Sequence, residues 1–169
     1  MSTLNERHTL AEQVAQAMGK SVYNNVEAHK DITPRLELQQ KSPKLMTLEE
    51  AIRHSGLKDG MTISFHHHFR GGDKVVNMVV AKLAEMGFKG LHLAASSLQD
   101  VHEPLIEHIR NGVITEISTS GLRGELAKEI SHGLMEKPVV FRSHGGRGEA
   151  IASGELHIDV AFLRASFSF

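Results

Sequence analysis

The amino-acid sequence predicts an α/β fold in which an open, mainly parallel sheet carries helices on both faces. Two observations predict it: short apolar segments alternate with amphipathic segments of helix length, and a glycine follows the end of each amphipathic segment. The strand candidates are residues 61–65, 90–95, 113–117, 139–141 and 157–163. The helix candidates between them are residues 73–86, 103–110, 122–132 and 147–153. Such alternation indicates parallel strands joined by right-handed crossovers.

The first strand and the helix after it have the clearest signals. Residues 61–65 are an apolar stretch of strand length, and the pair Gly71 and Gly72 turns the chain sharply after it. Asp73 is the predicted N-cap of the helix and Gly87 its predicted C-terminal stop. The apolar residues at the spacing i, i+3, i+4 and i+7 are Val76, Val79, Val80 and Leu83. A glycine loop that leads into a helix N-terminus lets backbone amides approach an anionic ligand.

Local signals bound the other helices. Thr47 and Glu50 form a capping-box pattern that opens a short helix, which runs to about His54 and is closed by Gly56. Pro104 stands at a first-turn position of the helix predicted over residues 103–110. The apolar residues in line on the next helix are Leu122, Leu126 and Ile130. Each of these helices therefore has an apolar side to place against the sheet.

The sequence divides into an N-terminal extension, residues 1–45, and an α/β domain, residues 46–169. Residues 9–18 form a predicted helix that Gly19 ends, and the following stretch has no sustained periodicity and contains Pro34 and Pro43. We interpret it as an extended arm. Two roles remain open for this arm: it packs on a partner subunit, or it is a partly ordered leader.

Composition excludes several classes of protein. The formal net charge of −1 gives no electrostatic basis for binding nucleic acid or an anionic membrane surface. The absence of cysteine excludes thiol nucleophiles and cysteine-ligated metal centres. Charged residues interrupt the N-terminus as they would not in a signal peptide, and no stretch approaches the roughly 18 apolar residues of a membrane span. We therefore expect a cytoplasmic protein.

Four loops at the carboxyl ends of the predicted strands share a composition. They are rich in glycine, serine or threonine, and two of them carry arginine beside paired glycines. These loops are residues 66–72, 96–100, 118–121 and 142–147. In open α/β sheets ligands bind outside the carboxyl ends of the strands, where loops and helix N-termini converge. The pattern predicts a site for a phosphorylated or carboxylated ligand, although such loops also serve plain turn geometry.

Three of these loops together resemble one family. The segments ISFHHHFRGGD from Ile63, STSGLRG from Ser118 and SHGGR from Ser143 closely resemble the alpha subunit of citrate lyase. The resemblance implies a CoA-transferase-like fold and an exchange of acetyl for citrate on an acyl-carrier-protein thioester, which releases acetate. It also implies two partners: a beta subunit that cleaves the citryl group, and a gamma subunit, the acyl carrier, that supplies a CoA-like prosthetic group. No cofactor is expected to be bound covalently to this chain. An oligomer is expected.

The resemblance also implies that residues 46–169 are the first of two related α/β halves, incomplete at the C-terminus. In CoA-transferases a glutamate attacks the thioester, and in this family that glutamate belongs to the second half. We assign no catalytic residue in this sequence, because helices, turns or an exposed strand face explain the candidate glutamates. These are Glu103, Glu116, Glu125, Glu149 and Glu155.

Binding roles follow for residues of the four loops. Gly71 and Gly72 would let amides approach the thioester and help form an oxyanion site, or they serve only a tight turn. Planar guanidinium groups suit citrate carboxylates or prosthetic-group phosphates, and the candidates are Arg70, Arg142 and Arg147, each of which could instead be a solvated surface arginine. The remaining predicted lining residues are Ser96, Ser97, Thr119, Gly121, Gly145 and Gly146.

The cluster His66, His67 and His68 invites a metal interpretation. Adjacent residues of an extended loop point in different directions, so at most two could converge on one ion. We expect no metal here and predict that His67 contacts substrate. Three hypotheses remain: part of a citrate CoA-transferase within a larger assembly, a non-catalytic half that binds CoA or an acyl carrier, and a metal-dependent hydrolase built on the histidines.

Overall fold

The structure is a computed structural model that describes residues 46–66 and 74–163. The N-terminal helix and arm predicted for residues 1–45 lie outside these residues, as do Asp73 and residues 164–169. The helices are α2 (Leu48–His54), α3 (Val75–Glu85), α4 (Leu105–Arg110), α5 (Gly124–Ser131) and α6 (His144–Ala152), with a 3₁₀ turn η1 (Asp100–His102). The strands are β1 (Thr62–Phe65), β2 (Leu91–Ala95), β3 (Ile114–Thr119), β4 (Val140–Phe141) and β5 (Val160–Phe162).

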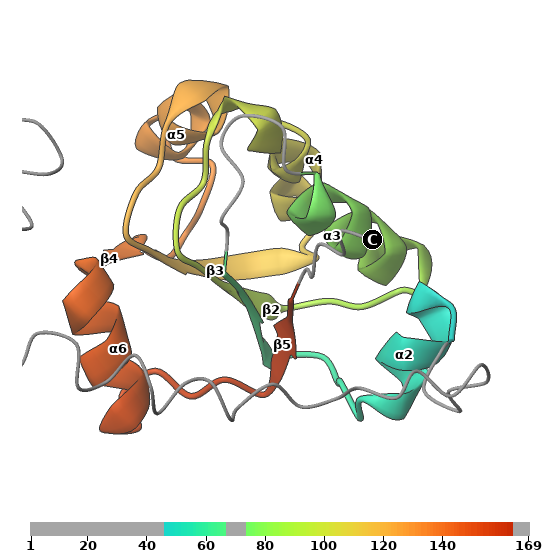
Figure 1. Ribbon diagram of the computed structural model, residues 1–169. Coiled ribbons are helices and arrows are strands. Elements are labelled where there is room, and N and C mark those ends of the chain that lie inside the picture. Colours follow the sequence, from blue (N-terminus) through green and yellow to red (C-terminus); the bar gives the residue numbers. More distant parts are fainter. Residues whose placement is uncertain (1–45, 67–73, 164–169) are drawn as a thin grey trace, which may run out of the picture. The chain divides into compact units, whose positions relative to one another are not determined.

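The five strands form one parallel sheet in the order β4-β3-β2-β1-β5. The chain moves from β1 to β4 in one direction and then returns to place β5 on the other side of β1. Because crossovers between parallel strands are right-handed, this reversal puts α6 on the face opposite α3, α4 and α5. Figure 1 shows α6 on its own side of the sheet. The predicted parallel α/β fold with helices on both faces is confirmed.

The face under α3, α4 and α5 holds the main core. The predicted stripe of α3 is buried there, with Leu83 fully enclosed. Alternate residues of the central strands, such as Ile63 and Leu93, meet it from the sheet. At the end of the sheet the rings of Phe65 and Phe162 stack with their centroids 5.3 Å apart, which fixes β5 against β1.

The opposite face is polar. Its buried apolar cluster consists only of Ala94, Ala150 and Leu156 among the described residues. The strand positions that alternate with the core residues carry Thr62, Ser64, His92, Glu116 and Ser118. Ser64, Ala94, Ser118 and Val140 lie side by side across four strands. The sheet therefore has one apolar face and one polar face.

The predicted capping box of α2 is confirmed. The Glu50 amide donates to Thr47 Oγ1 at 3.2 Å, and the Thr47 amide donates to Glu50 Oε2 at 2.8 Å. The predicted N-cap of α3, Asp73, was wrong: the helix begins at Val75, and Lys74 stands at the N-cap without a side-chain hydrogen bond. The helix predicted from residue 103 begins at Leu105, with Pro104 as N-cap.

Two loop boundaries were wrong. Ser118 and Thr119 belong to β3, not to the following loop, because both pair with residues of β2 and β4. Helix α6 begins at His144, so Gly145, Gly146 and Arg147 are helical rather than part of a loop. The Ser143 hydroxyl accepts a hydrogen bond from the Gly146 amide at 3.0 Å and caps this helix despite its glycines.

Candidate functional site

The carboxyl ends of the five strands lie at one edge of the sheet, because all the strands run in the same direction. The segments after β1, β2, β3 and β4 therefore start from this edge, as the sequence predicts. The first of them lies largely outside the described residues, which include neither His67, Arg70, Gly71 nor Gly72. Their predicted binding roles stay predictions. His66, at the end of β1, is exposed.

The segments after β2 and β3 are joined by backbone hydrogen bonds. The Leu98 amide donates to the Gly121 carbonyl at 2.8 Å, the Arg123 amide donates to the Leu98 carbonyl at 3.0 Å, and the Ser120 amide donates to the Ser96 carbonyl at 3.3 Å. A Cβ at Gly121 would lie 3.4 Å from Ser97 Oγ. The structure thus brings the predicted residues Ser96, Ser97 and Gly121 together, because these hydrogen bonds continue the β2–β3 pairing beyond the ends of the strands.

The hydroxyl of Thr119 is used within its own turn. Thr119 Oγ1 donates to the Gly121 carbonyl at 2.9 Å and lies 3.3 Å from the Gly121 amide, which donates to it. The side chain is buried, so in this conformation it shapes the turn. A local structural role therefore accounts for Thr119 without a ligand.

Gly124, at the start of α5, is held close to the preceding segment. Its φ of +71° belongs to the left-handed region, and a Cβ there would lie 2.4 Å from Asp100 Oδ1 and 2.9 Å from the Asp100 Cα. Only glycine allows η1 and the start of α5 to approach this closely. The last glycine of the STSGLRG segment therefore has a packing reason.

Arg142 follows β4, and both its backbone amide and its guanidinium form hydrogen bonds within the chain. Its amide donates to the Thr119 carbonyl at 3.0 Å, which continues the β3–β4 pairing. Its Nη2 donates to Glu155 Oε1 at 2.6 Å, an ion pair across the α6 segment. This guanidinium is already neutralised by a carboxylate of the chain.

The glycines at the start of α6 are not explained by the backbone. Gly145, Gly146 and Gly148 all lie in the helix with no positive φ, and a Cβ at Gly145 or Gly148 would meet nothing within 4 Å. Each glycine inside a helix costs roughly 0.5–1 kcal/mol relative to alanine. Gly146 has a packing reason, because a Cβ there would lie 3.2 Å from Ser143 Oγ, whereas local packing does not explain Gly145 and Gly148.

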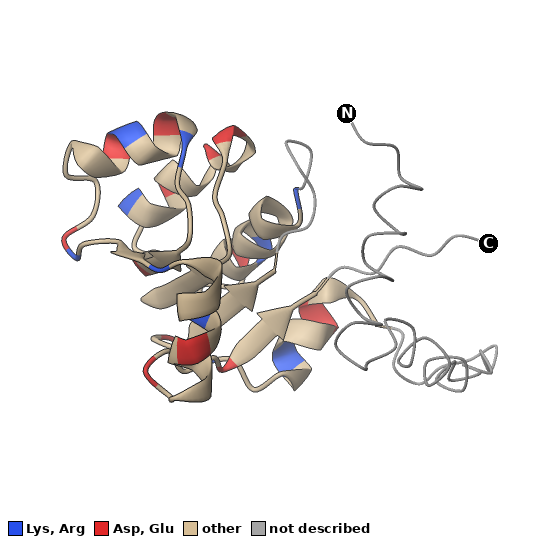
Figure 2. Cartoon of the chain, turned by 60° about the vertical axis from the view of Figure 1, so that its left-hand side comes forward, with Lys and Arg blue, Asp and Glu red and all other residues tan. Residues whose placement is uncertain are grey.

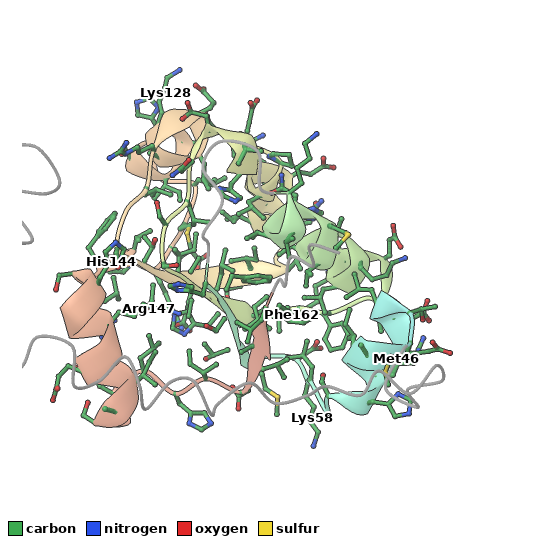
Figure 3. The ribbon with its side chains drawn as sticks, in the orientation of Figure 1. Met46, Lys58, Lys128, His144, Arg147 and Phe162 are labelled. Carbon is green, nitrogen blue, oxygen red and sulfur yellow. The ribbon has the colours of Figure 1, made fainter. Side chains whose placement is uncertain are left out.

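Arg147 extends from α6 toward the sheet, as Figure 3 shows. Its Nη2 donates to Ser64 Oγ at 2.9 Å and to the Ala94 carbonyl at 3.1 Å, while Nη1 is buried without a hydrogen-bond partner. No carboxylate of the described chain pairs with it, in contrast to Arg142. Burial of the guanidinium lowers the pKa of Arg147 below its ordinary value.

His92 lies on the same face, and the sequence did not single it out as a site residue. Its Nε2 lies 2.9 Å from Ser118 Oγ and its Nδ1 lies 3.4 Å from Thr62 Oγ1, so the ring bridges hydroxyls of the two neighbouring strands. Burial lowers the pKa of His92, partly opposed by the carboxylate of Glu116. The signal that could have found it is the alternation of polar residues along three strands of an otherwise apolar parallel sheet.

The candidate glutamates lie at the surface and most are ion-paired. Glu116 pairs with Lys137, Glu125 with Lys128 and Glu155 with Arg142. The hydrogen bond from Lys137 lowers the pKa of Glu116. Glu103 and Glu149 are exposed. None of these five carboxylates stands in an enclosed site, so none of the five is an evident nucleophile.

No group of three or more histidine and carboxylate side chains that could hold a metal ion occurs in residues 46–66 and 74–163. His67 and His68 fall outside these ranges, so the metal hypothesis stays untested. Charges of both signs are interspersed along the outer helices, as Figure 2 shows. Over the same described ranges, no helix has the length and apolar character needed to cross a bilayer.

The fold and its edge define the class: an open parallel α/β protein with a polar sheet face and loops of glycine, hydroxyl and arginine residues at the carboxyl ends of its strands. A model of the citrate lyase alpha subunit (CitF) family matches residues 42–168. The chain belongs to this family.

Curated relatives of this chain are citrate lyase alpha chains as well. The citrate lyase alpha chain of Klebsiella pneumoniae is 65% identical over an alignment that covers 78% of this chain and 28% of the relative. The alpha chain of Escherichia coli strain K12 is 68% identical over 69% of this chain and 23% of the relative. The chain thus spans about a quarter of the length of the curated relatives that it matches.

A solved structure supports the fold. The alpha subunit of citrate lyase from Streptococcus mutans, crystallised in complex with citrate, matches with a TM-score of 0.69 and 57% identity. The match covers 73% of this chain and 25% of the solved chain. The described domain therefore corresponds to one part of a larger subunit.

Proposed function

We propose that this chain is a component of a citrate CoA-transferase that exchanges acetyl for citrate on an acyl-carrier-protein thioester. The products are citryl-acyl-carrier protein and acetate, in the breakdown of citrate to acetate and oxaloacetate. The observation that carries the proposal is membership of the citrate lyase alpha subunit family, together with a relative 57% identical that was crystallised with citrate. The polar edge and the polar sheet face are suited to a ligand with three carboxylates.

The chemistry needs a carboxylate nucleophile. It attacks the acetyl thioester, the thiolate leaves, and a mixed anhydride forms; the returning thiolate then gives a glutamyl thioester and free acetate. Attack by a citrate carboxylate and the same steps in reverse give the citryl thioester. Because the glutamates described above are exposed or ion-paired, we place this nucleophile in another polypeptide or segment. The role of the present chain is to bind and orient the carboxylates and the thioester.

The partners follow from the same proposal. A beta subunit would cleave the citryl group, and a gamma subunit would present the CoA-like prosthetic group as the substrate thioester. Arg70 and the pair Gly71 and Gly72 remain our candidates for contact with that thioester. The interspersed charges on the outer helices favour protein and small-anion partners over nucleic acid (Figure 2).

The test is transfer of acetyl from acetyl-CoA to citrate, measured with the full chain alone and after addition of a polypeptide carrying the remaining residues of the Klebsiella pneumoniae relative. Hydroxylamine or borohydride traps a glutamyl thioester. We expect turnover only with both polypeptides and an adduct on the added one. No turnover with both would refute the proposed function, and an adduct within residues 1–169 would refute our placement of the nucleophile.

A second function is a non-catalytic half that binds CoA or an acyl carrier. The ion pairs of Glu116, Glu125 and Glu155 favour this function, because a carboxylate held by a cation is less available as a nucleophile. Titration of the full chain with CoA and with acetyl-CoA distinguishes it. Binding that persists when the complemented pair shows no transfer would support the non-catalytic half.

A further inference from the structure

Arg147 is a half-buried cation that no carboxylate of the described chain neutralises. Three other arginines of the described chain offer the contrast, because Arg53, Arg110 and Arg142 each pair with a glutamate. Arg147 instead contacts two neutral acceptors, Ser64 Oγ and the Ala94 carbonyl. A half-buried charge that lacks a counter-ion, and whose buried Nη1 has no hydrogen-bond partner, is costly to keep unless something else binds it.

Two carboxylates of this part of the domain already pair with other cations. Lys137 and Arg142 act on His92 electrostatically together with Arg147, and Glu116 is the carboxylate that opposes them. Glu116 already pairs with Lys137, and Glu155 already pairs with Arg142. Of these three cations, Arg147 is the one without a carboxylate partner in the described chain.

Neutral polar groups surround the same spot. Ser64 and Ser118 flank Ala94 in the row across the strands, and His92 bonds to Ser118. Burial lowers the pKa of His92, so its ring contributes no second positive charge to this spot near pH 7. Hydroxyl groups beside a guanidinium fork are the donors that a carboxylate accepts.

The helix that carries Arg147 is able to admit a ligand. Of α6 only Ala150 is buried, while Ile151 and the neighbouring Val140 are more than 40% exposed. The glycines at its start weaken the helix further. Since Nη1 is enclosed by the chain as it stands, a carboxylate reaches it through a small outward shift of α6 or a rotation of the guanidinium.

We propose that Arg147 binds a carboxylate between α6 and the polar face of the sheet, with Ser64 and Ser118 as flanking donors. Two sources of this carboxylate share the chemistry: citrate itself, in which case the inference rests on the proposed function, or an acidic side chain from the part of the family chain that this sequence does not span. In both, Arg147 supplies the guanidinium fork for which the sequence offered Arg70, Arg142 and Arg147 as candidates.

The experiment titrates citrate, and separately the complementing polypeptide described above, into the full chain and its variants by calorimetry. Arg147→Met removes the charge, Arg147→Lys keeps the charge without the fork, and Ser64→Ala removes a flanking donor. Arg110→Met is the matched control, because Arg110 lies on α4 and pairs with Glu129 at the surface. Circular dichroism establishes that each variant is folded.

We expect Arg147→Met to weaken one of the two associations by about tenfold or more, Arg147→Lys by less, and Arg110→Met not at all. Weakened citrate binding identifies citrate as the source, and weakened polypeptide association identifies a side chain. Wild-type affinity of folded Arg147→Met in both titrations would overturn the proposal, as would a wild-type chain that binds neither. If Arg147→Met does not fold, Arg147→Lys and Ser64→Ala decide in the same way. Absence of acetyl transfer with an Arg147-dependent association would refute the proposed function alone.

Discussion

The two faces of the sheet are built on different principles. On the side of α3, α4 and α5, large aliphatic residues such as Leu83, Leu93 and Ile117 are completely or almost completely enclosed. On the side of α6, hydroxyls, an imidazole and a guanidinium occupy the corresponding positions, and the apolar cluster is small. The first face holds the domain together, because burial of apolar area is the dominant favourable term in folding. The second contributes little of that term and is free to serve binding.

The largest expected change in stability comes from a substitution in the apolar face of the sheet. Leu93→Ala should lower the free energy of unfolding by roughly 2–5 kcal/mol, since Leu93 is fully buried in β2 and its loss leaves a cavity. Ile151→Ala on the exposed side of α6 is the control and should change it by less than about 0.5 kcal/mol. Urea denaturation measures both. Similar losses for the two variants would contradict the division between the faces.

The second effect contrasts two glycines. Gly124→Ala should destabilise the chain by roughly 1–3 kcal/mol, because it combines a left-handed φ with a clash against Asp100. Gly145→Ala should stabilise it by roughly 0.5–1 kcal/mol, because its backbone is helical and its Cβ has open space. Thermal and urea unfolding give both values. A destabilising Gly145→Ala would show that α6 packs more closely than the structure indicates.

The smallest effect is a pH dependence from the polar face. The folded state holds the pKa of His92 below its ordinary value of 6.5, so the unfolded state takes up the proton first as the pH falls. The wild-type chain should therefore lose stability relative to His92→Gln from about pH 6.5 downward, until the pH passes the folded-state pKa of His92. Urea midpoints for the two proteins at several pH values measure this difference. A difference that stays constant with pH would mean that His92 titrates normally.

Sequence reasoning was strongest where one physical signal decides the structure. The period of α3 and the capping box of α2 are local and strong, and both elements were found. The boundaries of β3 and α6 were missed because Ser118 and Thr119 are residues typical of turns, while Gly145 and Gly146 are typical of loops. Pairing with the neighbouring strands and the Ser143 cap overrode these preferences.

The candidate site was harder to predict than the fold. Composition pointed to Arg142 and Arg147 equally, but only the three-dimensional arrangement shows that Glu155 neutralises the first and that the second has no carboxylate partner within the described chain. Glu155 is close to Arg142 in the sequence, yet nothing in the residue pattern selects that pair. His92 and Ser64 were missed because each reads as an ordinary strand residue until the register of three strands places them together.

The placement of β5 beside β1 has a consequence for the order in which the domain assembles. The Thr62 amide donates to Asp159 Oδ2 across a separation of 97 residues, whereas the β1–β2 pairs are joined by a single crossover. Closing the longer loop costs more chain entropy and is compensated only when the strands between are already in place. We therefore expect strand β5 to join the sheet last. Until it does, β1 is an unpaired edge strand whose backbone groups, together with the ring of Phe65, can associate with another chain.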